Sequence, residues 1–246
     1  MTGKISRRTV LRRAAFVAVG VAVGSQLATP AHAVGPAPDP AHVRDAIKKA
    51  QEREKRVQTG IPSTNGWEME KVADDHGSVY TRPVTGVPVG GIQMRMADVE
   101  TVLVHVVRRF HYEVETLRGG DVTGWAQPDS VRKGLPESNL ASGTAVRIRS
   151  GSYPVGARGG FYPLQEVTLR DILADCDGVV RWGGDDAKPD ESLFYIDVRP
   201  GDERLGKVAA KIWEWNYTPG QGSGVLVDTF QPQRRTAADQ LAGRQS

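Results

Sequence analysis

Acidic side chains gather in one stretch of the chain, where their types could bind a cation or move a proton. Asp185, Asp186, Asp190 and Glu191 lie within seven residues of one another. Carboxylate oxygens suit hard cations such as Ca²⁺ or Mg²⁺, and a carboxylate can also act as a general acid or base. The spacing does not match the twelve-residue calcium loop. A solvated acidic loop is therefore the plain interpretation of this cluster.

Nucleophiles and imidazoles give weaker signals. The single cysteine, Cys176, allows no intrachain disulfide. Its neighbours Asp175 and Asp177 would raise the pKa of the thiol, which indicates a small buried residue rather than a nucleophile. Ser138 and Ser142 have no histidine nearby in sequence, and no Gly-x-Ser-x-Gly elbow is present. The histidines are His32, His42, His76, His105 and His111. The C-terminal half therefore offers no imidazole.

Two motifs carry the strongest functional signal. Residues 137–148 read Glu-Ser-Asn-Leu-Ala-Ser-Gly-Thr-Ala-Val-Arg-Ile, which is typical of a turn, a small-residue loop and a strand. Residues 182–185 read Trp-Gly-Gly-Asp, and an acidic pair and an apolar run follow at 190–198. Over roughly residues 92–212, the chain resembles the zinc D-alanyl-D-alanine carboxypeptidases, the group that includes the vancomycin-resistance D,D-peptidases.

The first family motif is Ser-x-His-x-x-Gly-x-Ala-x-Asp, in which the His and the Asp bind zinc. Ser138, Gly143 and Ala145 match this motif. Leu140 stands at the position of the zinc-binding His, and Arg147 stands at that of the Asp. The frame of the motif is present, and its two ligands are substituted.

The second family motif is Gly-Gly-Asp, followed by an acidic residue and, after two spacers, another zinc-binding His. Asp190 falls where the family has its catalytic carboxylate, and Leu193 falls where it has the His. Leucine has no lone pair to give, and arginine is a permanent cation. We therefore expect no zinc and no other cofactor. We also expect Asp190 to form a salt bridge with Arg147 in place of the metal.

The resemblance implies a cleft shaped for peptidoglycan stem peptides, and the missing ligands favour binding over catalysis. The cleft candidates are Arg147, Trp182, Tyr195, Ser138 and Arg95. Arg147 would suit a ligand carboxylate, whereas Arg95 aligns loosely with a substrate-steadying arginine and is more simply a surface residue. Two alternatives stay open. One is an active cell-wall D,D-carboxypeptidase with a non-standard metal site and Asp190 as its acid/base, and the other is a purely structural envelope protein.

The first 33 residues predict export. Ser6 to Leu11 is a twin-arginine signature, an apolar run too short for a confident membrane span follows, and Ala31-His32-Ala33 is a cleavage site. The formal net charge is +3, and the signal holds five basic and no acidic residues, so the mature chain carries −2. Nothing here indicates nucleic-acid binding. We expect a secreted or envelope-associated protein whose partner is peptidoglycan or an extracellular protein.

The pattern of short strands and separate helices predicts an α+β fold, with a small, mainly antiparallel sheet packed by helices. The resemblance implies the Hedgehog/DD-peptidase arrangement, with an N-terminal helical extension. The strongest helix is expected to be capped by Asp98, to present an apolar face through Leu117 and to stop at Gly119-Gly120. His105 and His111 are interpreted as ordinary residues of this helix.

The expected organisation is a signal at 1–33, a linker with a surface helix and edge strands at 34–90, a D,D-peptidase-like domain at 91–230 and a disordered tail at 231–246. Further helices are expected over residues 39–57, 164–174 and 203–215. Strands are expected over residues 78–82, 92–96, 145–149, 179–182 and 194–198.

Overall fold

The computed structural model describes residues 39–225 and 227–245. The expected signal at 1–33, with its twin-arginine motif, and the first residues of the linker lie outside the described residues. In the part that is described, none of the helices is both long enough and apolar enough to cross a membrane.

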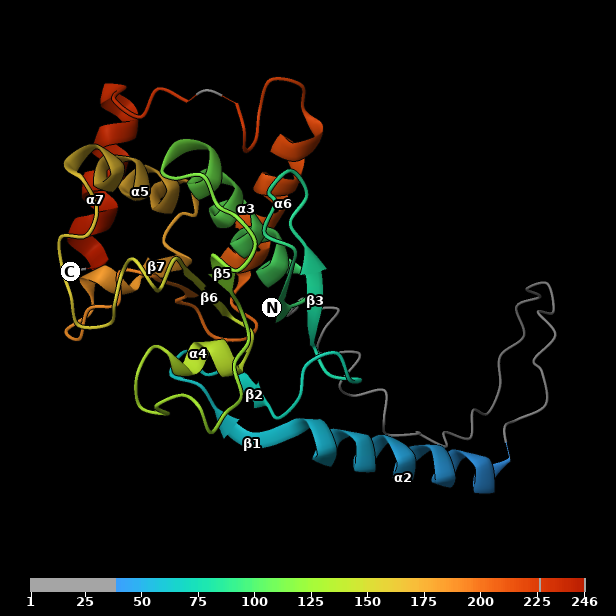
Figure 1. Ribbon diagram of the computed structural model, residues 1–246. Helices are drawn as coiled ribbons and strands as arrows, with labels where there is room; N and C mark the ends of the chain where they lie inside the picture. The colour runs from blue at the N-terminus through green and yellow to red at the C-terminus, as the bar shows by residue number, and fades with distance from the viewer. Residues whose placement is uncertain (1–38, 226, 246) are drawn as a thin grey trace, which may run out of the picture. The chain divides into compact units, whose positions relative to one another are not determined.

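The α+β class is confirmed, and a four-stranded antiparallel sheet forms its centre (Figure 1). Its strands are β5 (Val122–Thr123), β6 (Ala145–Ile148), β7 (Val180–Trp182) and β8 (Leu193–Ile196), in the order β5-β6-β8-β7. Three of the four had been expected from their apolar runs. β5 was missed because a two-residue strand carries no alternation to recognise.

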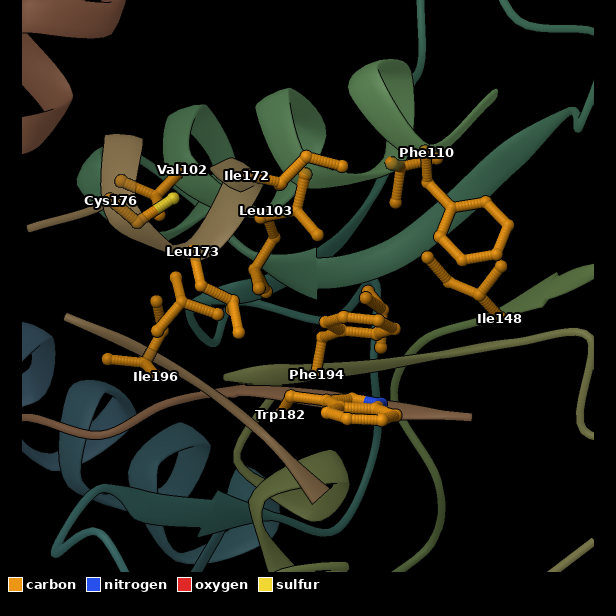
Figure 2. Close-up of a cluster of buried hydrophobic side chains, with 14 of the residues drawn as sticks. Val102, Leu103, Phe110, Ile148, Ile172, Leu173, Cys176, Trp182, Phe194 and Ile196 are labelled. Atoms are coloured by element: carbon orange, nitrogen blue, oxygen red, sulfur yellow. The ribbon is translucent and has the colours of Figure 1, made fainter. Parts of the chain in front are cut away.

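The two faces of this sheet bury different clusters, because successive residues of a strand point to opposite sides. Phe194 and Ile196 of β8 lie in the main core, under α3 (Asp98–Glu113) and α5 (Pro163–Asp175). Figure 2 shows these two side chains among apolar residues that include Leu103 of α3 and Leu173 of α5. Leu193 and Tyr195 point the other way, into a smaller cluster with the short helix α4 (Ser138–Ala141).

Helix α3 differs at both ends from the expectation. Asp98 is its first residue and not its cap; the capping position is Ala97, which has a φ of 69° and makes no side-chain cap. The helix ends at Glu113, before the expected glycines. The imidazole Nδ1 of His111 accepts a hydrogen bond from the backbone N–H of Leu117 at 2.9 Å, so the chain turns away earlier. Leu117 is nevertheless fully buried, which is why it extended the apolar pattern.

The N-terminal extension consists of α2 (Pro40–Val57) and two hairpin-like pairs. β1 (Gln58–Pro62) pairs with β2 (Glu68–Glu70), and β3 (Val79–Pro83) pairs with β4 (Gly91–Arg95), both antiparallel. The second pair crosses the boundary expected at residue 91. Helix α6 (Glu203–Tyr217) follows the central sheet and packs against α3.

The expectation of a disordered tail at 231–246 is wrong for the part of it that the structure describes. Residues Pro232–Gln245 form helix α7, which packs on α5. Its apolar contact is small, with Ala238 and Leu241 buried. Ion pairs supply much of the attachment: Arg234 Nη2 lies 2.6 Å from Asp171 and 2.9 Å from Asp175, both on α5. Sequence periodicity missed this helix because its attachment depends on charge pairing more than on an apolar stripe.

Candidate functional site

The three positions at which the motif resemblance predicts zinc ligands lie on one side of the central sheet. Arg147 of β6 and Leu193 of β8 are direct cross-strand partners, so their side chains share a face. Leu140 of α4 belongs to the same buried cluster as Leu193. Residues that are far apart in the sequence are thus brought together on the face opposite α3 and α5.

The expected salt bridge between Arg147 and Asp190 is confirmed. Arg147 donates to Asp190 Oδ2 from Nη2 at 2.9 Å and from Nε at 3.1 Å. Arg147 Nη2 also lies 3.3 Å from Glu137 Oε2. The Asp190 side chain is only 7% exposed and that of Arg147 is 20% exposed. Water therefore screens this pair much less than it would screen an ion pair on the surface.

Both carboxylates in this cluster are fully engaged. The other oxygen of Asp190 accepts a hydrogen bond from Ser192 Oγ at 2.6 Å. Glu137 accepts from Arg132 through its backbone N–H at 2.6 Å and its guanidinium at 2.7 and 2.8 Å. These hydrogen bonds from Arg132, helped by the charge of Arg147, lower the pKa of Glu137 to about 2. Each carboxylate is thus held by an arginine.

These residues do not fit a zinc ion. Leu140 and Leu193 have no donor atoms, and the cation of Arg147 would repel a dication. Asp190 has both oxygens occupied by protein donors. Across residues 39–225 and 227–245, no group of three or more His, Cys, Asp or Glu side chains is placed to hold a metal ion.

A small hollow opens beside the cluster. Its cavity volume is about 20 Å³, which is room for about one water. Lys188 and Arg132 line it together with Glu137, Asp190 and Val155. Val155 belongs to a glycine-rich segment. This segment is hydrogen-bonded to the acidic loop, because the backbone N–H of Gly156 donates to Pro189 O at 2.7 Å.

The local structure requires glycine at position 143. Its φ is +68°, and a Cβ there would lie 2.8 Å from the backbone nitrogen of Arg95 and 2.7 Å from a methyl of Val79. Only glycine adopts this conformation freely and allows such a close approach. Gly143 therefore sets the turn between α4 and β6, which brings Leu140 and Arg147 to one face.

Of the other cleft candidates, Tyr195 lies on the face of Arg147 and Trp182 does not. The hydroxyl of Tyr195 donates to Asp186 at 3.0 Å, and burial followed by the charge of Asp186 raises the pKa of that phenol. Trp182 is buried in the main core, and its indole N–H donates to Glu191 O at 2.8 Å. Trp182 is therefore a core residue, and the expectation that it lies in the cleft was wrong.

Ser138 and Arg95 also have structural partners. Ser138 is fully buried, and its Oγ accepts from the backbone N–H of Thr64 at 3.0 Å. Arg95 donates to Ser142 O at 2.9 Å and to Glu68 O at 2.8 Å, and its guanidinium lies over the ring of Trp67. Arg95 is thus not the surface residue that we expected, and its hydrogen bonds hold the N-terminal extension against the motif loop.

Glu137, Arg132 and Lys188 were not recognised from the sequence as parts of this site. Glu137 directly precedes Ser138, and Arg132 lies five residues before Glu137. A charged pair flanking the first motif was therefore a usable signal. Lys188 gave none, since an exposed lysine in an acidic loop resembles any solvated charge.

Comparisons with protein-family models, with curated proteins and with solved structures gave no match.

Proposed function

We propose that this protein is a secreted, zinc-free relative of the D,D-carboxypeptidases, with a Hedgehog/DD-peptidase-like domain, that binds peptidoglycan stem peptides without hydrolysing them. The observation that carries the proposal is the convergence of Leu140, Arg147 and Leu193, with the Arg147–Asp190 pair beside them. Three positions chosen from sequence motifs alone meet at one place. The ion pair found there supports a zinc-free site, because the motif resemblance predicts the metal ligands at these positions.

The ligand group that suits this surface is a carboxylate, such as the C-terminus of a stem peptide. Lys188 is exposed, and within the described residues it has no ion pair. Arg147 Nη1 and Arg132 Nη1 likewise have no hydrogen-bond partner there, because their bonds run through Nε and Nη2. Guanidinium and ammonium donors are strong partners for a carboxylate. The hollow is too small for a peptide side chain, so the ligand would lie across the surface.

The test is a calorimetric titration, in the presence of chelator, with a stem pentapeptide that ends in D-Ala-D-Ala. The same peptide with a C-terminal amide is the matched probe. We expect saturable binding of the acid and binding about tenfold weaker for the amide, as for the loss of one charged contact. No binding of either peptide would overturn the proposal.

Two lysine variants test whether the peptide binds at this surface and not elsewhere on the protein. Lys188→Met should weaken binding about three- to tenfold without disturbing a buried pair. Lys207→Met, an exposed lysine on α6, is the matched control and should bind like the unmodified protein. Release of D-alanine during incubation with zinc would instead favour the alternative of an active carboxypeptidase with Asp190 as its acid/base.

A further inference from the structure

A second cavity lies among the helices, away from the Arg147 site. Its volume is about 400 Å³, which is in the range of small-molecule sites. Helices α3, α5, α6 and α7 line it, together with the segment that joins α6 to α7. The lining residues that matter for its chemistry are His105, Arg109, Asp175, Trp215, Asp228 and Arg234.

His105 lines this cavity, and one of its ring nitrogens is buried beneath the cavity wall without a hydrogen-bond partner among the described residues. Its Nδ1 lies 3.0 Å from Ser223 Oγ, whereas Nε2 is covered and has no partner among the described residues. Burial, followed by the charges of nearby cations of which Arg109 is the first, lowers the pKa of His105 to about 3. The ring is therefore neutral near pH 7. Buried polar atoms in proteins nearly always have a partner, so Nε2 is the position that a bound molecule would complete.

The charges around the cavity are matched to one another. Arg109 donates to Asp175 at 2.6 Å and to Asp171 at 2.9 Å, and it also pairs with Glu113. Arg234 binds the same two aspartates. Asp228 is exposed at the rim, where it accepts the backbone N–H of Phe230. Among the described residues, Arg109 and Arg234 are already paired with the acidic side chains around them, which favours an uncharged ligand over a charged one.

An aromatic surface completes the wall. The rings of Trp215 and His105 lie 5.9 Å apart and are tilted by 43°. Flat aromatic groups pack favourably at such distances in offset or edge-to-face arrangements. We propose that the cavity binds a small, uncharged, planar aromatic ligand whose amide-like edge meets His105 Nε2 and whose ring packs on Trp215.

Because Nε2 has no exposed surface in this structure, a ligand would contact it only after a neighbouring segment of the chain shifts. Gly220, Gly222 and Gly224 all have positive φ values, of 79°, 85° and 95°. Gly220 and Gly222 line the cavity, and glycine exchanges between backbone conformations at little steric cost. The ligand therefore reaches Nε2 when these glycines move.

Three matched probes test the proposal on the purified protein. Benzamide is planar, neutral and carries an amide edge; benzoate adds a charge; cyclohexanecarboxamide keeps the amide and loses the planar ring. Side-chain NMR of His105 and Trp215 follows each titration. We expect benzamide to shift the Nε2 resonance saturably, with a Kd in about the millimolar range for so small a molecule. The other two should bind about tenfold more weakly. No saturable shift, or equal shifts with all three probes, would overturn the proposal.

Two variants assign the contact. His105→Phe keeps a ring and removes Nε2, so benzamide should bind about three- to tenfold more weakly, the factor of one hydrogen bond. Ser223→Ala keeps Nε2 and the backbone carbonyl that Arg108 contacts, and should bind much as before. Unchanged affinity in His105→Phe contradicts the assignment. If that variant does not fold, the titration of the unmodified protein still decides.

Discussion

The guanidinium of Arg147 donates two hydrogen bonds to a single oxygen of Asp190, from Nη2 at 2.9 Å and from Nε at 3.1 Å. Strand register supports this relationship, because Arg147 is paired with Leu193, and Asp190 lies three residues before Leu193 in the loop that leads into β8. Both side chains are largely buried. The pair is therefore an integral part of this face of the sheet, and it lies where the motif resemblance predicts zinc ligands.

Removing one partner of this pair should be costly, because it leaves the other charge buried. We expect Arg147→Met or Asp190→Asn to lower the free energy of unfolding by on the order of 3 kcal/mol. The double variant Arg147→Met/Asp190→Asn should lose less than the sum of the two single losses. Urea unfolding of the four proteins measures the coupling. Additive effects of the two single changes would show that the side chains do not interact.

Glu137 should give the protein an acid-sensitive component of stability. Its pKa is lowered from 4.5 to about 2, first by hydrogen bonds from Arg132, so folding favours the ionised form. This stabilisation is complete above about pH 4.5 and is lost as the pH falls toward 2, with a size of up to about 3 kcal/mol. Glu137→Gln should flatten the unfolding free energy over this range. Glu214→Gln, an exposed carboxylate on α6, is the control; if the two profiles coincide, Glu137 is not held as described.

Gly143 should tolerate no side chain. A methyl group there would meet the backbone nitrogen of Arg95 at 2.8 Å on a residue with φ of +68°. We expect Gly143→Ala to destabilise the fold by about 2 kcal/mol or more. Gly134→Ala is the matched control, because its added Cβ would have no atom within 4 Å, and its effect should stay within about 0.5 kcal/mol. Equal thermal stability of the two variants would mean that the loop relaxes freely.

Two neighbouring arginines on α7 should differ sharply in their contribution to the stability of the fold. Arg234 pairs with Asp171 and Asp175 of α5, whereas Arg235 pairs with Asp239 of its own helix. Arg234→Met leaves the buried Asp171 with fewer donors, and we expect a loss of about 1–3 kcal/mol. Arg235→Met should change stability by less than about 0.5 kcal/mol. Thermal unfolding separates them, and equal midpoints would indicate that α7 is not attached.

The sequence predicted the central strands and helices because their apolar residues repeat at strand or helix periods. The two sequence motifs also predicted that Leu140, Arg147, Asp190 and Leu193 lie close together. Hydrophobic periodicity alone could not have predicted this. The predictions from sequence were wrong where the position of a residue depends on contacts with segments far away in the chain. Trp182 and Arg95 are residue types that often occur in binding sites. The structure shows that Trp182 lies in the core and that Arg95 donates hydrogen bonds to Ser142 O and Glu68 O.

His105 illustrates a second limit of sequence reasoning. The sequence predicts an ordinary helix residue at this position, because its i+3 and i+4 neighbours form no recognisable motif with it. Its significance comes from Ser223 and Trp215, which lie more than a hundred positions away in the chain. Neither the pairing nor the cavity could be inferred from local pattern.

The most direct test of the central claim is the zinc content of the purified protein, measured by elemental analysis after expression with zinc supplied. Since Leu140, Arg147 and Leu193 cannot ligate a metal, we predict less than about a tenth of an equivalent. Close to one equivalent, removable by chelator and lost in Asp190→Asn, would contradict the account, because the Arg147–Asp190 pair would then not be what occupies this site.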